Sequence, residues 1–346
     1  MSKVITSDSQ LAELLSKTKR VAVVGISDKE DRPSNGVSRW LQKNSHFELY
    51  FVNPTLTTVL GNPCYASLSD IPVEIDMVDI FRKVSDIPAV VDEAIGIGAK
   101  SIWIQLGLRD DESAERAIAA GRHVLMEKPP ATTLGEAEAL TELAAKAGVT
   151  FFATWHSRFA LGVEPAKQWL SDKVIQSISI VWKEDVRRWH PGQAWIWEPG
   201  GFGVFDPGIN ALSILTEIVP GHIMVEKSTL EFPENKKQPI AASIAMRTVE
   251  GAPITAEFDW RQEGPQTWDI TVQTNAGELR LSKGGSELYI GGEEQASGPD
   301  REYAAIYERF AKLIHARQSD TDYQPLRIVA DSFLCGERKV VAPFED

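Results

Sequence analysis

Short apolar strands alternate with helical segments over the first 126 residues, and this pattern constrains the fold more than any other feature. Buried strands are expected at 21–24, 48–52, 77–81, 102–106 and 123–126, and helices at 36–43, 85–98 and 111–120. The strands are short, continuous apolar runs, as in sheets that are covered on both faces. Because strands that alternate with helices pair in parallel, the sequence predicts an α/β, Rossmann-like, doubly wound parallel sheet.

The pattern changes after Pro130. Helices are expected at 133–147, 163–171, 206–218, 301–317 and 325–338, and strands at 174–184, 223–232, 240–248, 253–260, 268–274, 277–282 and 286–291. A run of consecutive strands predicts an α+β domain with a large, mostly antiparallel sheet. We therefore expect two domains, 1–125 and 126–346, with a C-terminal helix that packs back on the first. The open face of the second sheet is expected to be exposed or to form a homodimer.

Composition limits the class of protein. The chain has 346 residues, enough for two cores, and a net charge of -13, which argues against a nucleic-acid partner. Two cysteines, Cys64 and Cys335, cannot form a disulfide framework, as is typical of a reducing compartment. No apolar run approaches the roughly 20 residues of a membrane span, and the N-terminus lacks an apolar signal core. We expect a cytoplasmic protein without a membrane partner and, because no His/Cys/Asp cluster has ligand spacing, without a metal.

The segment Gly25-Ile26-Ser27 follows the first strand and precedes a helix. A helix N-terminus offers unpaired N–H groups to an anion, and ligands of doubly wound folds gather at such turns. The alternative is a plain strand-to-helix turn. An NAD site normally needs Gly-x-Gly-x-x-Gly and an acidic residue after the second strand. Ser27 stands at the second glycine and Asn53-Pro54 at the acid, so both departures weaken an NAD interpretation.

Residues of about 20–121 resemble the CoA-binding domain family, which has a Rossmann-like fold. The resemblance rests on collinear segments: 21–27, Pro33-Ser34-Asn35-Gly36-Val37, Phe51-Val52-Asn53-Pro54, Gly61-Asn62-Pro63-Cys64-Tyr65, 76–82 and 103–107. It implies that a nucleotide groove is lined by Gly25, Ser27, Asn53, Pro54, Phe81, Arg82 and Gln105. Arg82 could instead be a solvated charge at a strand end.

Chemically active residue types gather in the second half. Lys128 follows a buried strand, and Pro129 biases it to an extended conformation in which its amine could meet a substrate oxygen. It could also be simply solvated. Asp206 and Asn210 are four residues apart on an expected helix and share one side of it. Asp206 with Pro207 also fits a helix start, with Asp at the N-cap and Pro at N1, and the two roles can coexist.

From about His123 onward the chain resembles the glucose–fructose oxidoreductase and inositol dehydrogenase (Gfo/Idh/MocA) family, and within it the D-galactose and L-arabinose 1-dehydrogenases. The motifs are Glu127-Lys128-Pro129, Trp155-His156, 182–193 and 205–212. The resemblance implies an NAD(P)-dependent oxidoreductase with Lys128 and Asp206 as catalytic residues and Glu127 and Lys128 beside the cofactor. It assigns the sugar to His156, Glu184, Trp189, His190 and Asn210. Many relatives carry His at the position of Asn210; since Asn cannot exchange protons, Asp206 or another group must take the hydroxyl proton.

The two resemblances meet between about 107 and 125, so we infer a chimera of natural or engineered origin. Three hypotheses follow. The first is an NAD(P)-dependent aldose 1-dehydrogenase that converts galactose or arabinose to a lactone. The second is a CoA- or adenine-nucleotide-binding module with a vestigial sugar domain, and the third is a folded chimera without useful activity. The intact residues Lys128, His190, Asp206 and Asn210 favour the first, and Gly25-Ile26-Ser27 with Asn53-Pro54 favours the second.

Overall fold

The computed structural model describes residues 19–30, 32–104, 111–298 and 302–345, and it divides into two compact units. Unit 1 comprises Met1–Ala131, Gly135–Thr154 and Ile306–Thr321. Unit 2 comprises Thr132–Leu134, Trp155–Ala305 and Asp322–Asp346. Each unit therefore contains segments that are far apart in the sequence.

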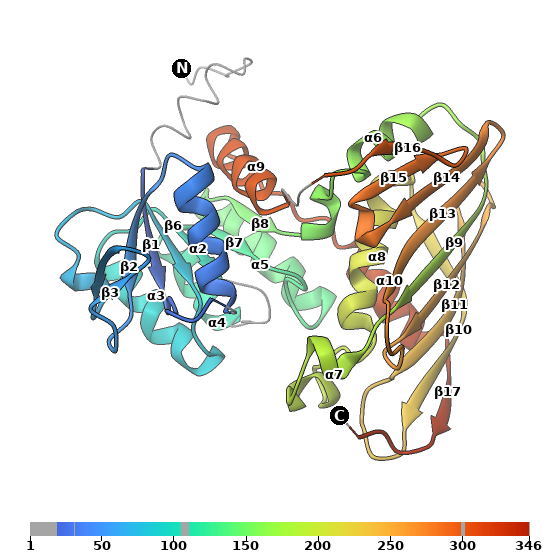
Figure 1. The fold of residues 1–346 in the computed structure, drawn as a ribbon, viewed down its shortest axis with the longest axis horizontal. Coiled ribbons are helices and arrows are strands. Elements are labelled where there is room, and N and C mark those ends of the chain that lie inside the picture. The colour runs from blue at the N-terminus through green and yellow to red at the C-terminus, as the bar shows by residue number, and fades with distance from the viewer. Residues whose placement is uncertain (1–18, 31, 105–110, 299–301, 346) are drawn as a thin grey trace. The chain divides into compact units, whose positions relative to one another are not determined.

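Unit 1 is built on an eight-stranded sheet with the order β3-β4-β2-β1-β5-β6-β7-β8 (Figure 1). Its strands are β1 (Arg20–Val24), β2 (Glu48–Val52), β3 (Thr58–Val59), β4 (Asn62–Tyr65), β5 (Met77–Ile80), β6 (Ser101–Ile104), β7 (His123–Met126) and β8 (Phe151–Ala153). All pairs are parallel except β3 with β4. This confirms the predicted Rossmann-like sheet. The chain leaves β1 first toward β2 and later toward β5, so the topological switch point lies at the carboxyl end of β1.

Helices cover both faces of this sheet. They are α2 (Pro33–Asn44), α3 (Ile87–Gly96), α4 (Asp111–Ala119), α5 (Leu134–Ala147) and most of α9 (Glu302–Ala316). α3, α4 and α5 bury their apolar residues against Val78, Ile80 and Ile102. Tyr307 of α9 lies on the opposite face, where its ring is 4.0 Å from that of Trp103 and its hydroxyl is 3.3 Å from Asp79. A helix from near the end of the chain thus completes the core of the first unit.

His123 makes unit 1 sensitive to acid. The N–H of Thr150 donates to its Nδ1 at 3.0 Å, and burial lowers the pKa of the imidazole. The folded state therefore favours the neutral ring, whereas the unfolded chain takes up a proton near pH ~6.5. This contribution to stability is complete above that pH and is lost as the pH falls toward the lowered folded pKa. We expect His123→Gln, which keeps an acceptor, to lose less stability than the wild type between pH 7.5 and 5.5 in urea melts. Equal losses would contradict this.

Unit 2 contains a nine-stranded sheet with the order β16-β15-β14-β13-β9-β12-β11-β10-β17 (Figure 1). Its strands are β9 (Ile175–Lys183), β10 (Ile223–Pro233), β11 (Ala241–Thr248), β12 (Pro253–Asp259), β13 (Thr267–Thr274), β14 (Gly277–Ser282), β15 (Glu287–Ile290), β16 (Glu293–Ala296) and β17 (Gly336–Val341). Only β9 with β12 and β10 with β17 pair in parallel among these strands. The predicted large, mostly antiparallel sheet is confirmed.

The prediction that a helix spans 325–338 is wrong at its C-terminal end. α10 (Gln324–Leu334) stops before Cys335, and the chain then forms β17, which pairs with Ser228–Pro233 of β10. A Cβ on Gly336 would lie 2.6 Å from the carbonyl oxygen of Ser332, so only glycine fits this sharp reversal. Glu337, Arg338 and Lys339 suit a helix, but pairing with the free edge of β10 overrides that preference.

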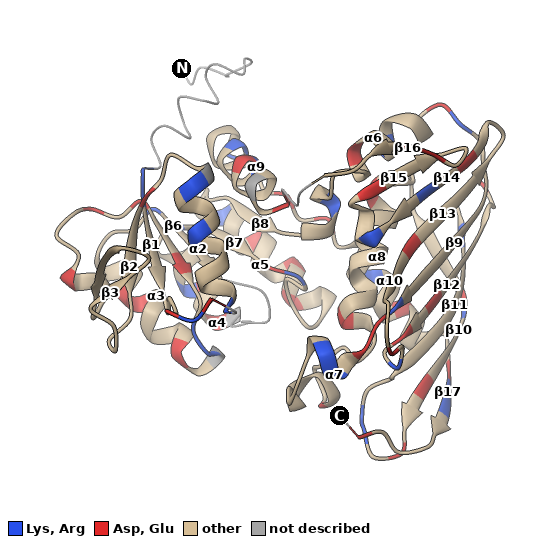
Figure 2. Cartoon of the chain, in the orientation of Figure 1, with Lys and Arg blue, Asp and Glu red and all other residues tan. Residues whose placement is uncertain are grey.

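Helices lie against one face of the unit 2 sheet, as Figure 1 shows for α6 (Val163–Leu170), α8 (Phe205–Ile218) and α10. α8 is almost completely buried, and its Gly208 brings it close to Phe258 of β12, where a Cβ would lie 2.8 Å from the ring. Acidic and basic residues are mixed over the elements of each unit (Figure 2). Within the described residues, no helix has the length and apolar character needed to cross a membrane.

Candidate functional site

The turn after β1 is tightly packed. Gly25 has a φ of +87°, and a Cβ there would lie 2.3 Å from the carbonyl oxygen of Phe81 and 2.7 Å from Cδ of Arg82. Backbone bonds from Gly25 to Val52 and from Phe81 to Val24, each 2.8 Å, continue the sheet past the strands. Gly25, Phe81 and Arg82 therefore meet at the switch point, and only glycine fits the first position.

Side chains brace this turn. The Ser27 N–H donates to Oγ of Ser34 at 3.1 Å, and the Asn35 amide donates to the Ser27 carbonyl at 2.9 Å. Asn53 donates to the Ile26 carbonyl at 2.7 Å, while its Oδ1 accepts from the N–H and hydroxyl of Thr55. Asn53 therefore links the ends of β1 and β2, and its oxygen is already used within the turn.

The remaining predicted groove residues lie at the same edge or outside the described part. Pro54 follows Asn53 and is exposed, and Arg82 pairs with Asp86 at 3.1 Å. Gln105 lies outside the described residues. Six of the seven predicted groove residues thus flank the carboxyl ends of β1, β2 and β5.

Lys128 and Glu127 follow β7, at the same edge of the parallel sheet but beyond β5 and β6. Both are buried, with Lys128 only 4% exposed, so its amine is not simply solvated. The Lys128–Pro129 peptide is cis. The Thr154 N–H donates to the Met126 carbonyl at 2.8 Å and holds the end of β7 to the chain after β8. The lysine thus sits on a rigid, buried strand end.

Asp206 and Asn210 lie on consecutive turns of α8, as the sequence predicts. The expected N-cap role of Asp206 is wrong: the cap is Val204, and α8 already begins at Phe205. The helix starts earlier because the turn at Gly203, with φ +53°, lets the N–H of Asp206 bond the Gly203 carbonyl at 2.9 Å. Asp206 is 7% exposed and lies within the first turn of α8.

His190 lies beside Asp206, with 3.3 Å between Nε2 and Oδ2. It follows the short helix α7 (Val186–Trp189), which Asp185 caps by accepting from the Arg187 N–H at 3.0 Å. The Arg187 side chain also bonds that carboxylate and lowers the pKa of Asp185, so the cap stays ionised. Nδ1 of His190 is 3.2 Å from Oε1 of Gln193, which orients the ring toward Asp206.

Glu184 is buried at the end of β9 between two indoles. Oε1 accepts from Nε1 of Trp260 at 3.2 Å, and Oε2 accepts from Nε1 of Trp268 at 2.9 Å. The Trp189 ring is 5.6 Å from that of Trp268, and the His190 ring is 5.4 Å from that of Trp260. Glu184, Trp189, His190 and Asp206 therefore belong to one connected cluster of unit 2.

Trp260 and Trp268 were not expected at the site from the sequence. Neither is among the six tryptophans, of ten, that lie between residues 151 and 200. The available signal was weak: Trp260 follows the end of an alternating strand, as Glu184 does. Trp260 and Trp268 reach Glu184 only because β9 lies between β12 and β13 in the sheet, and this strand order is set by the tertiary fold.

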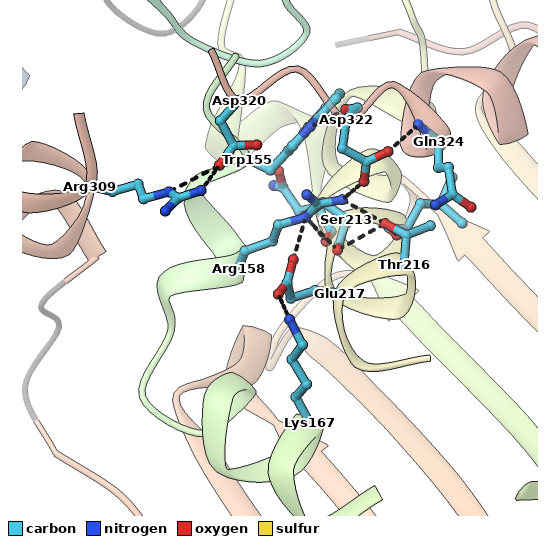
Figure 3. Close-up of polar contacts among 12 residues, drawn as sticks. Trp155, Arg158, Lys167, Ser213, Thr216, Glu217, Arg309, Asp320, Asp322 and Gln324 are labelled. Atoms are coloured by element: carbon cyan, nitrogen blue, oxygen red, sulfur yellow. Dashed lines mark hydrogen bonds and ion pairs between the residues drawn. The ribbon is translucent and has the colours of Figure 1, made fainter. Parts of the chain in front are cut away.

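His156 stands apart from this cluster in the contacts of the described residues. Its Nδ1 is 2.8 Å from Oε2 of Glu302, and its ring stacks on Tyr303 with 6.5 Å between centroids. The neighbouring Arg158 is deeply embedded: it donates to the Ser213 carbonyl and to Thr216 and pairs with Asp322 (Figure 3). Arg158 thus fixes the segment that carries His156 against α8.

Among the described residues, no group of three or more His, Cys, Asp or Glu side chains could hold a metal ion. The arrangement in unit 2 is an organic acid–base set: a carboxylate with an adjacent imidazole, surrounded by indole rings. Such a set suits proton transfer to and from a hydroxyl, and the rings suit the C–H faces of a sugar.

Comparison with known proteins finds relatives of two kinds. The CoA binding domain family matches residues 19–135. A galactose 1-dehydrogenase of Pseudomonas fluorescens is 47% identical over 244 residues, which cover 67% of this chain and 75% of that protein.

Solved structures resemble the whole chain. The D-galactose 1-dehydrogenase of Rhizobium etli has 43% identity and a TM-score of 0.76, covering 95% of this chain and 98% of that one. KijD10, a 3-ketoreductase from Actinomadura kijaniata solved with NADP and TDP-benzene, has a TM-score of 0.67 over 93% of this chain and 99% of that one; at 14% identity it shows the fold alone. The chain therefore belongs to the galactose 1-dehydrogenase branch of the glucose–fructose oxidoreductase and inositol dehydrogenase family, with a first region that matches CoA-binding domains.

Proposed function

We propose that this protein oxidises C1 of a pyranose such as galactose or arabinose to a lactone, with NAD(P) as hydride acceptor. The observation that carries the proposal is the pair formed by buried Asp206 and half-buried His190, 3.3 Å apart, next to Glu184 and its two indoles. It occurs in a chain that is 47% identical to a galactose 1-dehydrogenase.

Asp206 accepts the proton of the C1 hydroxyl in this proposal. A carboxylate that is buried and lies beside an imidazole can pass the proton on to His190, and through it to solvent. Asn210, one turn along α8, holds a neighbouring hydroxyl because its amide both donates and accepts. Glu184 and His156 bind further hydroxyls, and Trp189 packs against a C–H face of the ring.

Lys128 positions the C1 oxygen in this proposal. Its ammonium can donate three hydrogen bonds, and burial at the end of β7 restricts where they point. As the C1–H bond breaks, a carbonyl forms at C1. A positive charge beside the C1 oxygen holds the sugar in the orientation from which the hydride leaves. Glu127, also buried, lies next to it in the chain.

The described residues fit a phosphate-bearing nucleotide at the switch point, where Gly25 closes the turn after β1 and α2 begins with Pro33 at its first position. They fit the ribose of NAD less well. The position that usually carries an acid is Asn53, whose oxygen already accepts from Thr55. When bound, a nicotinamide nucleotide supplies the hydride acceptor, and Gly25, Ser27, Arg82, Glu127 and Lys128 are the residues we assign to holding it.

Turnover is the direct test. We expect galactose- or arabinose-dependent reduction of NAD or NADP at 340 nm, with the lactone as product. All four pairs of sugar and cofactor should be assayed, with myo-inositol as the polyol control. Absence of reduction with every pair would refute the proposal.

CoA binding is a second candidate, and the match of residues 19–135 to CoA-binding domains favours it. We expect CoA to raise the thermal midpoint more than NAD or NADP does, because a ligand that binds only the native state stabilises it by about 2.7 kcal/mol at 100 times its Kd. Arg82→Ala should reduce the shift, since Arg82 borders Gly25. A shift with NAD(P) and none with CoA would remove this candidate.

We further infer a homodimer in the cytoplasm. In the described part of unit 2, the sheet presents exposed polar side chains such as Ser243 and Glu257, which bond each other at 2.7 Å. Cys64 and Cys335 are both free thiols, which supports the inferred cytoplasmic location.

Light scattering after gel filtration tests the inferred homodimer, and a monomeric mass would exclude it.

A further inference from the structure

The segment after β17 is held by the loop between β10 and β11, which spans residues 234–240. Oδ1 of Asn235 accepts from the Phe344 N–H at 2.9 Å, and its Nδ2 donates to the Phe344 carbonyl at 3.0 Å. One amide side chain thus grips both backbone groups of one residue, much as a strand partner would. The Glu234 N–H adds a bond to the Val341 carbonyl at 3.1 Å.

The grip fixes the ring of Phe344 between two partners. The ring lies 6.1 Å from that of Trp197, and the Arg187 guanidinium lies 5.7 Å from its centroid. Arg187 is itself paired with Asp185 and Glu263, so its guanidinium is held in place on one side of the Phe344 ring. Phe344 is half-buried, and its exposed remainder leaves room for a larger aromatic side chain.

Trp197 connects Phe344 to the cluster around Glu184. Its ring makes an edge contact with that of Trp260 at 5.3 Å. Trp260 is fully buried, donates to Glu184 and lies 5.4 Å from the ring of His190. Phe344, Trp197 and Trp260 therefore form a continuous row of aromatic rings that ends on two of the residues assigned to the sugar.

The same loop supports the start of α8. The Lys237 N–H bonds the Trp197 carbonyl at 3.2 Å, and the Val204 N–H bonds the Pro239 carbonyl at 2.8 Å, two residues before Asp206. Gly203 passes so close that a Cβ would lie 2.4 Å from the Pro239 oxygen. The loop that grips Phe344 is thus packed directly behind both Trp197 and the helix end that carries Asp206.

We propose that Phe344 is a positioning residue for the sugar: held by Asn235, it fixes Trp197 and Trp260 and thereby the place of Glu184, which is assigned to a sugar hydroxyl. The inference rests on the proposed function, because it concerns the same sugar. Phe344 touches no reacting group. Its loss should therefore weaken sugar binding in the ground and transition states alike, raising KM with little change in kcat.

The test measures galactose binding by calorimetry and turnover by steady-state kinetics in the full chain. We expect Phe344→Ala to raise the Kd and KM for galactose about tenfold, below the roughly hundredfold that a 1 Å misplacement of reacting groups can cost. The value of kcat should stay within about twofold of the wild type. Phe344→Tyr, which keeps the ring, should restore binding, and Asn235→Ala should weaken it in the same direction.

Arg338→Ala is the matched control. Arg338 also connects the end of the chain to an aromatic residue, with its guanidinium 3.9 Å from the Phe232 ring, but that contact does not lead to Trp197. Unchanged galactose binding in Phe344→Ala would overturn the inference and leave the proposed function intact. Absence of galactose binding by the wild type would overturn both. If Phe344→Ala does not fold, Asn235→Ala decides, and wild-type affinity in that variant would equally overturn the inference.

Discussion

Replacement of Lys128 by alanine is expected to reduce sugar-dependent turnover at least about a thousandfold while the fold survives. Lys128 is 4% exposed at the carboxyl end of β7, where its amine is assigned to the C1 oxygen. Alanine removes both the charge and the group that orients this oxygen, but it leaves the backbone of the strand end in place. The measurement is kcat/KM for galactose, with circular dichroism and the thermal midpoint as checks on the fold.

Lys146→Ala provides the matched control for this prediction. Lys146 also belongs to unit 1, but its side chain is exposed near the end of α5 and pairs only with Glu142 one turn earlier in the described contacts. We expect Lys146→Ala to leave kcat/KM within about twofold of the wild type, as for a surface pair of small energetic value. A Lys128→Ala enzyme as active as Lys146→Ala would eliminate the proposed role of Lys128.

Replacement of Arg158 by alanine is expected to lower the free energy of unfolding of unit 2 by about 3 kcal/mol. The Arg158 side chain is 11% exposed and bonds the Ser213 carbonyl, Thr216 and Asp322 (Figure 3). Its removal leaves the Asp322 carboxylate without its cation and the end of α8 without two donors. The expected loss in free energy of unfolding lies at the lower end of the range for breaking a buried ion pair, because the Asp322 side chain is 30% exposed.

Arg309→Ala separates burial from the mere presence of an arginine–aspartate pair. Arg309 is 46% exposed and bonds Asp320 at 2.8 Å, so its loss should cost at most about 1 kcal/mol. Urea melts followed by tryptophan fluorescence suit Arg158→Ala, because eight of the ten tryptophans belong to unit 2, whereas Arg309 and Asp320 belong to unit 1 and Arg309→Ala is followed by circular dichroism. A loss of at most about 1 kcal/mol in Arg158→Ala would show that the Arg158 network stabilises unit 2 no more than an exposed ion pair would.

The sequence determined the elements whose signals are local. Apolar runs that end in Gly25 or Asn53 fix strand ends, and alternating residues such as Ile178, Ile180 and Trp182 fix which side chains face the core. A spacing of four places Asp206 and Asn210 on one side of a helix. These features depend only on neighbouring residues. The family could also be predicted from the sequence, because its motifs are short, local patterns.

Only the tertiary structure decided which distant segments meet. The sequence divided the chain near residue 125, whereas the structure also assigns Gly135–Thr154 and Ile306–Thr321 to unit 1. It made residues 336–341 a strand, because the edge of β10 was available for pairing. It brought Trp260 and Trp268 to Glu184 by placing β9 between β12 and β13. Such choices depend on backbone groups and surfaces that become neighbours only when the sheet assembles, so no local pattern in the chain encodes them.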